Sequence, residues 1–287
     1  MDEPTTDPMS TAGRDPRGPV LVTGGTGTLG RAVVRKLLER GDAVRVLSRR
    51  PRPHHLAVAG AAGGGQNPEW ATGDLASGEG LAAAVAGVRS VVHCATTGTG
   101  KDVEATQRLT EALSRSGAEP HLIYISIVGV DLVPFFYYRA KAEAERIVQG
   151  SGLPWTILRA TQFHDLIARL TTAQRWLPVT LYPAGLSFQP IEVGEVAERL
   201  ADLALGEPSG RVADMGGPEV RTSRELARLT LHAYRRRRPL LAVPLAGKAA
   251  RGYRAGHHTT PGNAVGRRTF TEYVVASAAA RDSGRRQ

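Results

Sequence analysis

The sequence predicts an α/β protein built on a doubly wound parallel sheet, with a smaller lobe formed by its C-terminal part. Apolar runs of strand length alternate with helix-like segments from residue 19 to residue 161, and this alternation is typical of parallel sheets. A glycine-rich turn joins the first of these strands to the first helix. The 287 residues are enough to bury a large core without cross-links, and a single cysteine, Cys94, excludes an intrachain disulfide.

Six apolar segments have the length and composition of strands. They cover residues 19–24, 43–49, 69–74, 90–96, 121–129 and 155–161. The run 121–129 is almost continuously apolar, as expected for a strand that is buried on both faces. Helical spacing of apolar residues predicts helices over 29–41, 80–87, 102–117 and 137–152, and the Pro/Ala/Gly-rich stretch 51–68 predicts a loop. Right-handed crossovers then give the strand order of a Rossmann-type fold.

The residues on either side of this sheet have a different character. Residues 1–18 are polar and lack the apolar stretch of a signal peptide, so we predict a disordered N-terminal tail. After residue 161 we predict helices over 193–206 and 223–234 and short strands over 188–193 and 211–216. The predicted organisation is therefore a tail (1–18), a sheet domain (19–161) and an α+β lobe with a basic tail (162–287).

The net charge of +10 comes from the C-terminal segment. Residues 235–287 contain 12 Lys or Arg and 2 Asp or Glu, whereas the rest of the chain contains 25 of each class. We interpret this segment as a solvated, partly frayed tail, with an arm that binds nucleic acid or acidic lipid as the alternative. Because few aromatic residues lie near the run 235–238, we expect no nucleic-acid partner. No apolar run approaches the roughly 18 residues of a membrane span, so we also expect a cytoplasmic protein without a membrane partner.

The turn after the first strand has glycines at the spacing that a dinucleotide requires. Gly24 allows a sharp turn out of the strand, Gly27 leaves room for backbone amides to approach a pyrophosphate, and Gly30 allows the helix to pack closely on the strand. The N–H groups at the helix N-terminus then point at the phosphates, and Thr26 and Thr28 add hydroxyl donors. The pattern therefore predicts a dinucleotide site, and a purely structural turn is the alternative.

The end of the second strand indicates which dinucleotide binds. Sites selective for NAD have an acidic residue about 20 positions after the glycines, whereas an arginine there accommodates the 2′-phosphate of NADP. Arg49 lies 19 residues after Gly30, and no acidic residue stands at this strand end. A guanidinium can bind a phosphate through two hydrogen bonds. We therefore predict NADP, with NAD as the alternative in which the arginine faces solvent.

With these residues in view, the chain resembles the atypical short-chain dehydrogenase/reductase superfamily in its NmrA-like branch. The matching pieces are VTGGTGTLG (22–30), SRRP (48–51), GDL (73–75), HCAT (93–96), YISIVGVD (124–131), YYRAKAEAE (137–145) and LPWTILRATQFHD (153–165). They are specific for the family and not for a substrate. The resemblance implies an NAD(P)-binding Rossmann domain and an oxidoreductase activity.

The resemblance also implies residue roles. Asp74 and Leu75 would flank the adenine, Cys94 to Thr96 would lie along the ribose and phosphates, Ser126 would face the nicotinamide, and Lys141 would bind its ribose. Residues 160–163 would close over the nicotinamide or border the substrate. The expected cofactor contacts are Gly24, Thr26, Gly27, Thr28, Leu29, Gly30, Arg49, Asp74, Leu75, Cys94, Ala95, Thr96, Lys141, Ala160, Gln162 and Phe163.

Three residues have the chemistry for proton transfer. Tyr137 and Lys141 are four residues apart on a predicted helix, so they share a face. An ammonium near the phenol is expected to lower the tyrosine's pKa, and Ser126 would orient a carbonyl oxygen. Tyr138 is equally close in sequence, and the serine lies only 11 residues before Tyr137. A catalytic role and a packing role for Tyr137 therefore both stay open.

These observations lead to two functional hypotheses. The first is an NADP-dependent oxidoreductase that transfers hydride to a small carbonyl, quinone or conjugated acceptor. The second is a non-catalytic, NADP-sensing regulator that binds a protein partner. A homo-oligomer is compatible with either. We expect no metal site, and we interpret His257 and His258 as a surface pair, His93 as a packed strand residue, and His164 and Asp165 as a helix start or substrate contacts.

Overall fold

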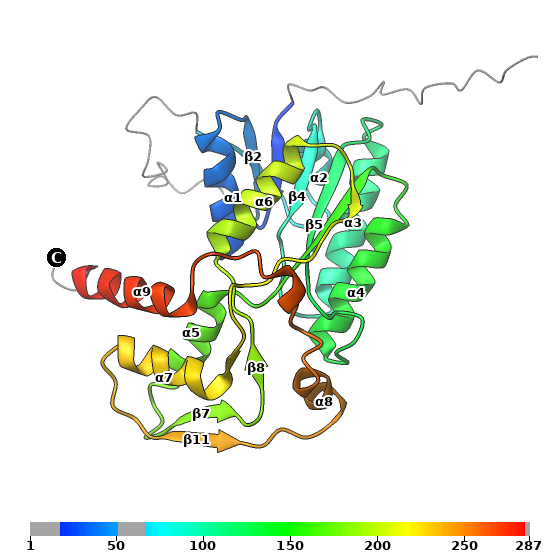
Figure 1. The fold of residues 1–287 in the computed structure, drawn as a ribbon. Coiled ribbons are helices and arrows are strands. Elements are labelled where there is room, and N and C mark those ends of the chain that lie inside the picture. Colours follow the sequence, from blue (N-terminus) through cyan, green and yellow to red (C-terminus); the bar gives the residue numbers. More distant parts are fainter. Residues whose placement is uncertain (1–17, 51–66, 285–287) are drawn as a thin grey trace, which may run out of the picture.

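The computed structural model describes residues 18–50 and 67–284. The predicted tail over 1–18 and the predicted loop over 51–68 lie almost entirely outside these ranges. The described residues form a central sheet with helices on both faces and a lobe on one side of it (Figure 1). None of the described helices is long and apolar enough to cross a lipid bilayer.

The central sheet has seven parallel strands in the order β3-β2-β1-β4-β5-β6-β9, which confirms the predicted Rossmann-type fold. The strands are β1 (Val20–Thr23), β2 (Val44–Ser48), β3 (Glu69–Thr72), β4 (Ser90–His93), β5 (His121–Ile127), β6 (Trp155–Ala160) and β9 (Gly210–Arg211). In the central register Val22 lies between Val46 and Val92. The inner strands β1, β4, β5 and β6 are buried along almost their whole length because helices cover both faces of the sheet.

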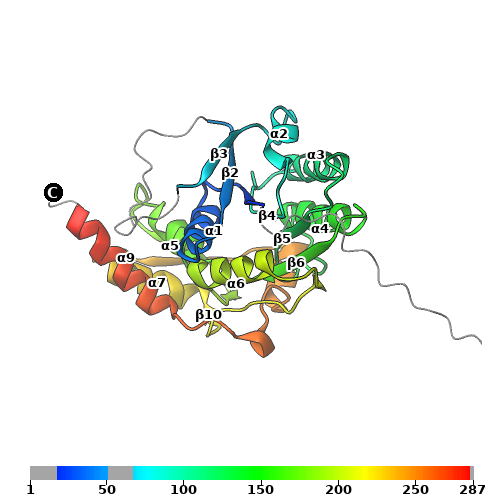
Figure 2. The same ribbon diagram turned by 90° about the horizontal axis from the view of Figure 1, so that it is seen from above.

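Two helical layers bury the sheet (Figure 2). Helices α1 (Thr28–Glu39) and α6 (Val193–Leu205) pack together on one face. Helices α2 (Leu81–Val85), α3 (Lys101–Arg115) and α4 (Phe136–Gln149) cover the other. Each layer forms its own apolar core with the strands beneath it.

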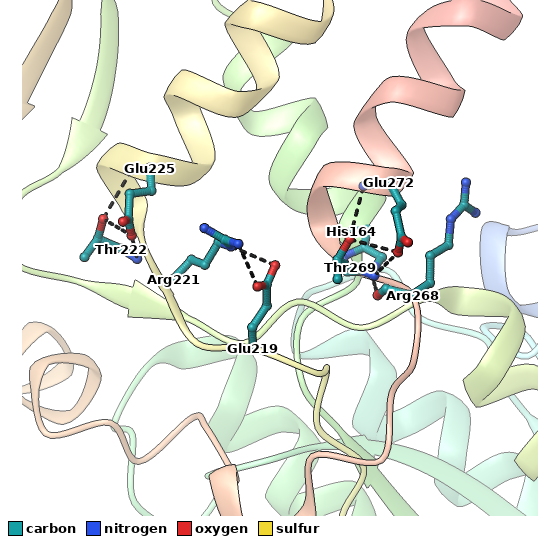
Figure 3. A network of polar contacts seen from close by, with 8 residues as sticks. All are labelled: His164, Glu219, Arg221, Thr222, Glu225, Arg268, Thr269 and Glu272. Carbon is teal, nitrogen blue, oxygen red and sulfur yellow. Dashed lines mark hydrogen bonds and ion pairs between the residues drawn. The ribbon is translucent and has the colours of Figure 1, made fainter.

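The lobe lies beyond the carboxyl ends of the strands (Figure 1). Its helices are α5 (His164–Thr172), α7 (Ser223–Ala233), α8 (Lys248–Arg254) and α9 (Phe270–Gly284), with a 3-10 turn at Pro261–Asn263. Its strands form two small sheets: β7 (Thr180–Pro183) pairs with β11 (Leu240–Val243), and β8 (Ser187–Phe188) pairs with β10 (Arg221–Thr222). Helices α7 and α9 both begin at a capping box, in which a threonine and a glutamate exchange hydrogen bonds (Figure 3).

The lobe differs from the sequence prediction in three respects. The C-terminal segment is not a frayed tail up to residue 284, because it forms β11, α8 and α9, and Phe270 of α9 is fully buried. Residues after 161 also build the sheet layer, since β9 extends the sheet and α6 packs on α1. The strand predicted over 188–193 is limited to β8, followed by a single bridge from Ile191 to Phe163.

Candidate functional site

The glycine turn between β1 and α1 has the close approaches that its sequence predicts. Gly24 has a φ of +66°, and a Cβ on it would lie 2.7 Å from the Cα of Ala95. A Cβ on Gly30 would lie 2.1 Å from the carbonyl oxygen of Gly24, so only glycine lets the helix pack this close to the turn. The backbone therefore needs glycine at both positions for its own geometry.

The N-terminus of α1 is open. Gly27 is the N-cap residue and has no side chain to cap the helix, and no acidic residue lies in the first turn. Thr26, Gly27 and Thr28 are exposed, while Leu29 and Gly30 are buried. The first N–H groups of a helix lack intrahelical partners, so this end presents donors and a positive dipole to an anion. Leu29 can contribute its backbone N–H, because its side chain belongs to the core.

The loops after β2 and β3 lie side by side. The N–H of Gly73 donates to the carbonyl of Ser48 at 3.0 Å, so the two strand ends meet. Arg49 follows Ser48 and is exposed. Asp74 accepts a hydrogen bond from the N–H of Ala76 at 2.9 Å, and Leu75 packs on the core beneath α2. Arg49 and the Asp74–Leu75 pair are thus brought to one edge of the sheet.

The loop after β4 is held by a buried carboxylate that the sequence analysis missed. Asp102, at the start of α3, accepts hydrogen bonds from the hydroxyl of Thr96 at 2.5 Å and from the N–H and hydroxyl of Thr97 at 2.6 and 2.7 Å. Burial opposes its ionisation, but these hydrogen bonds prevail and hold the pKa of Asp102 below its usual value. Cys94 and Ala95 precede this loop, and burial raises the pKa of the Cys94 thiol to about 12. The thiol is therefore protonated and unreactive at neutral pH.

The two adjacent tyrosines of α4 have different surroundings. The hydroxyl of Tyr137 lies 3.4 Å from that of Thr96, so this ring faces the loop after β4. Tyr138 is buried in a small apolar cluster and packs edge-on against Tyr253, with ring centroids 5.9 Å apart. Tyr137 is therefore the tyrosine that faces the candidate site, and Tyr138 has the packing role.

Lys141 and Ser126 are both buried, and they lie on the adjoining elements α4 and β5. The Nζ of Lys141 donates to the carbonyl of Ile125 at 3.1 Å and lies 4.7 Å from the centre of the Tyr124 ring. Ser126 is 3% exposed, and its hydroxyl has no hydrogen-bond partner among the described residues. A buried polar atom without a partner is costly, so its presence indicates a ligand position.

The ionisation of these groups differs from the sequence prediction. Burial lowers the pKa of Lys141 to about 8, against an opposing effect of the Asp102 carboxylate. The pKa of Tyr137 is raised by burial, with the Thr96 hydrogen bond opposing it, and not lowered by the lysine as predicted. The phenol is therefore protonated at neutral pH, which suits a proton donor and not a base.

Residues after β6 connect the sheet to the lobe. Ala160 and Thr161 are buried, and Ala160 forms a bridge with Met215. The amide nitrogen of Gln162 donates to the hydroxyl of Tyr138 and to the carbonyl of His258, both at 3.4 Å, while its buried Oε1 has no partner among the described residues. Phe163 is the N-cap residue of α5.

A strap of residues 256–268 crosses this end of the sheet between α8 and α9 (Figure 1). Its backbone bonds to the side chain of Gln189 through Thr260 N–H at 2.7 Å and to the backbone of Gly216 on both sides. A Cβ on Gly129, which follows β5, would lie 2.1 Å from the carbonyl oxygen of His257. The strap therefore covers the ends of β5, β6 and β9.

A second buried charge network lies beside the site. The Arg159 guanidinium on β6 binds the carboxylate of Glu145 on α4 at 2.8 and 2.5 Å, and that of Asp131 after β5 at 2.5 and 3.0 Å. Arginine is rarely buried without a partner, so an arginine within the apolar run 155–161 was the signal available in the sequence. The network ties α4, which carries Tyr137 and Lys141, to the sheet.

The histidines have structural roles. His93 exchanges hydrogen bonds with Thr23 and Thr106, and burial lowers its pKa to about 3, as expected for a packed strand residue. His164 lies under α9 and its Nε2 is 3.0 Å from the carbonyl of Arg268 (Figure 3). His258 is fully buried with Nε2 2.7 Å from the carbonyl of Ser187, so the prediction of a surface pair is wrong for it. Across the described ranges, His, Cys, Asp and Glu side chains form no group that could hold a metal.

Comparisons with known proteins agree with this geometry. Residues 24–198 match the model of a family described as NAD(P)H-binding. A (4-alkanoyl-5-oxo-2,5-dihydrofuran-3-yl)methyl phosphate reductase of Streptomyces griseus is 32% identical over 219 residues, which cover 72% of this chain and 70% of that protein. The photosystem II assembly factor Ycf39 of Cyanophora paradoxa is 27% identical over 246 residues, covering 79% of this chain and 72% of the other.

A solved structure shows the same fold at low sequence identity. The NADPH-dependent quinone oxidoreductase of Escherichia coli, in complex with NADPH, superposes with a TM-score of 0.74 at 18% identity. The match covers 90% of this chain and 99% of that chain.

Proposed function

The chain belongs to the NAD(P)H-binding family of the atypical short-chain dehydrogenase/reductase type, and from this premise we propose that it is an NADPH-dependent reductase of a small carbonyl, quinone or conjugated acceptor. The observation that carries the proposal is the buried pair of Lys141 and Ser126. The Lys141 ammonium and the Ser126 hydroxyl, which has no hydrogen-bond partner among the described residues, are buried on α4 and β5, and α4 also carries Tyr137. A merely structural site would not leave these groups buried with so few partners.

The cofactor would lie along the carboxyl ends of the strands. Its diphosphate would bind the open N-terminus of α1, where Gly27 allows close approach. The loop held by Asp102 would lie along the ribose and phosphates, with Cys94, Ala95 and Thr96 as contacts. Residues 160–163 and the strap would close the nicotinamide end.

Each polar group would have one task in the reaction. The bound nicotinamide supplies the hydride, and the protein supplies orientation and the proton. Lys141 would hold the nicotinamide ribose, and Ser126 would donate a hydrogen bond to the acceptor oxygen. Tyr137 would transfer its phenolic proton to that oxygen as hydride reaches the carbon, which yields the alcohol or hydroquinone. The phenolate would then regain a proton from solvent on its exposed side.

The preference for NADPH over NADH would depend on Arg49. Arg49 is exposed at the end of β2, with no acidic residue beside it in the sequence. Arg49→Glu should weaken NADPH binding at least tenfold and leave NADH binding unchanged or stronger. Titration by the fluorescence of the reduced nicotinamide measures both. Equal affinity of the variant and the wild type for NADPH would contradict this assignment.

Oxidation of NADPH at 340 nm tests the activity, with a panel of quinones, aldehydes and unsaturated lactones as acceptors. Tyr137→Phe should lower kcat by about 10²–10⁴-fold, since it removes the proton donor, and should leave the Kd for NADPH unchanged. The matched variant Tyr138→Phe removes a hydroxyl from the neighbouring packing position and should retain kcat within a few-fold. Failure to consume NADPH with every acceptor would contradict the proposal.

The alternative is a regulator that binds NADP without turnover and contacts a protein. The similarity to a photosystem II assembly factor supports this alternative. It predicts NADPH binding without oxidation, together with a partner whose capture changes when NADP is added. Affinity capture with and without NADP, followed by the 340 nm assay on the same preparation, separates the two functions.

A further inference from the structure

A positively charged cavity lies in the lobe and has no part in the proposed reaction. It has a volume of about 370 Å³ and lies between the end of α5, the segment after α7, and α9. Its lining consists of Arg169, Thr172, Ala173, Arg175, Trp176, Arg236 and Arg281. Four guanidinium groups and an indole therefore surround it, with no acidic side chain in the lining. We call this cavity the arginine pocket.

Two arginines of the run 235–238 have a structural role, because they donate hydrogen bonds to backbone carbonyls. Arg238 donates to the carbonyls of Gln174 and Arg175 at 2.7 and 2.6 Å, and Arg236 reaches the carbonyl of Thr172 at 3.5 Å. These arginines cap the C-terminal end of α5, where positive charge is favourable. The fold thus accounts for two of the arginines in the run 235–238.

The remaining guanidinium groups have no such partner. Arg169, Arg175 and Arg281 form no ion pair within 4 Å with any acidic side chain that the structure describes, although the carboxylate of Asp165, one turn earlier on α5, attracts the Arg169 guanidinium at longer range. Arg175 and Arg281 instead lie over the rings of Trp176 and Tyr234, at 4.8 and 4.9 Å. Like charges that share a cavity repel one another, and a bound anion removes this repulsion.

Exposed apolar side chains border the same cavity. Trp176 is 83% exposed, Leu170 59% and Leu241 53%, with Leu177 and Leu181 also exposed. Gln174 joins these positions, because its side chain bonds to the backbone of both Leu170 and Leu181. Leu181 lies opposite Leu241 in the β7–β11 pair. Of these side chains Trp176 lines the cavity, and the leucines lie on the adjoining segments; we call Trp176, Leu170, Leu177, Leu181 and Leu241 the leucine rim.

We propose that the arginine pocket and the leucine rim form a docking surface for an anionic lipid bilayer, in which a headgroup phosphate enters the pocket. Guanidinium groups bind phosphate through paired hydrogen bonds, and each basic residue near an anionic surface strengthens binding. Trp and Leu side chains insert at the boundary between headgroups and acyl chains. This contact is peripheral, so it is compatible with helices that cannot span a membrane.

Three other occupants fit this face less well than a lipid bilayer. A second copy of the chain would bring the same arginines against each other across a two-fold interface. Nucleic acid would satisfy the guanidinium groups and Trp176, but it would leave the leucines exposed to water. An acidic protein with an apolar centre fits less well than lipid, because the pocket has only cationic groups where protein interfaces combine both signs. These occupants are outcomes of the test below.

Co-sedimentation with phospholipid vesicles tests the proposal on the full chain. The protein should bind vesicles that contain phosphatidylglycerol, and binding to pure phosphatidylcholine vesicles should be weak. Added salt should weaken binding to the anionic vesicles. The triple variant Arg169→Gln/Arg175→Gln/Arg281→Gln should bind about 100-fold more weakly, since each basic residue contributes roughly fivefold. Trp176 emission should shift to the blue on anionic vesicles, and Trp176→Phe should lose that shift.

Matched controls make the result specific. Arg108→Gln/Arg115→Gln/Arg146→Gln removes three arginines from the α3–α4 side and should leave vesicle binding unchanged. Leu170→Ser should weaken binding, whereas Leu205→Ser, at an exposed position on α6, should not. Absence of binding to anionic vesicles at low salt would overturn the proposal. Arginine-dependent binding of free pyrophosphate, DNA or an acidic protein without vesicle binding would also overturn it, as would a dimer in which Trp176 is already shielded.

Discussion

Burial lowers the pKa of the Lys141 ammonium, so a bound ligand can change its protonation. Lys141 is 4% exposed, and its ammonium donates a hydrogen bond to the carbonyl of Ile125. Burial lowers its pKa to about 8, so part of the population is neutral at slightly alkaline pH. A bound dinucleotide would bring negative charge and ribose hydroxyls to this position. The charged form would then be favoured, and the pKa would rise.

This change predicts proton uptake when NADPH binds. At pH 9 the free protein holds Lys141 mostly neutral, so binding should take up most of one proton, whereas at pH 6.5 the lysine is already charged and uptake should be absent. Calorimetric titration in buffers of different ionisation enthalpy measures the number. Lys141→Met should abolish the difference between the two pH values. Equal uptake by the wild type at both pH values would show that this lysine does not contact the cofactor.

The sequence gives the element on which a residue lies where a strand end or helical spacing determines its position. Ser126 lies at the end of β5, and Tyr137 and Lys141 lie one turn apart on α4, as their positions in the sequence predict. Asp102 could not be predicted in this way. Its role depends on the conformation of the loop 96–98, which brings three donors onto one carboxylate.

At the scale of the element, the junction of β1 and α1 depends on the absence of a Cβ atom at Gly30. The backbone of Gly24 turns with a positive φ and places its carbonyl against Gly30. The position of the helix on the sheet, and hence the direction of its N–H groups, follows from this contact. The element therefore tolerates no Cβ at Gly30.

Gly30→Ala should destabilise the protein by about 1–3 kcal/mol or more, because its Cβ would lie 2.1 Å from the carbonyl oxygen of Gly24. NADPH binding should weaken with it. Gly100→Ala is the matched control, since Gly100 is the N-cap residue of α3, has a φ of −58°, and a Cβ there would have no neighbour within 4 Å. Urea unfolding measures both variants. Equal stability of the two variants would contradict the packing argument.

Arg159 connects α4 to the sheet through two carboxylates, Glu145 and Asp131, which differ in their exposure to solvent. Glu145 is 5% exposed and Asp131 57% exposed. Arg159→Met would leave the Glu145 carboxylate buried without its counter-charge, so we expect a loss of about 3–5 kcal/mol. Asp131→Asn changes an exposed partner and should cost about 1 kcal/mol or less. Chemical unfolding of the two variants tests the ranking, and a larger loss for Asp131→Asn would reverse the assignment.

At the scale of the whole molecule, the lobe has a core of its own. Ile167, Leu226, Phe270 and Val274 pack together at the junction of α5, α7 and α9, separate from the two cores that bury the sheet. The sheet and the lobe therefore depend on different apolar contacts. The candidate site lies where the two meet.

Phe270→Ala should impair the lobe and leave cofactor binding by the sheet intact. The loss of a fully buried ring should cost about 3–5 kcal/mol. The Kd for NADPH should change by less than threefold, because the glycine turn belongs to the sheet, while acceptor reduction should fall. Val275→Ala, at an exposed position of the same helix, should leave both unchanged. Loss of NADPH binding in parallel with activity would show that lobe and sheet unfold as one unit.

The inner strands of the sheet were predictable because they are mostly apolar, whereas α9 was not predicted, for a physical reason. Phe270, Val274 and Ala278 form its buried stripe, but alanines and serines fill much of the surrounding sequence and give little contrast with it. The strands β7 and β11 are short and pair with each other from distant parts of the chain. Such pairings depend on tertiary contacts that local sequence does not encode.

The strap at residues 256–268 is synthesised after all strands and helices of the sheet, so the candidate site is completed last. The ribosome releases the strands and helices of the sheet well before the residues that cross the ends of β5, β6 and β9. A nascent chain can therefore fold its sheet while the nicotinamide end is still uncovered. The candidate site would then be complete only after residues 256–268 have been synthesised.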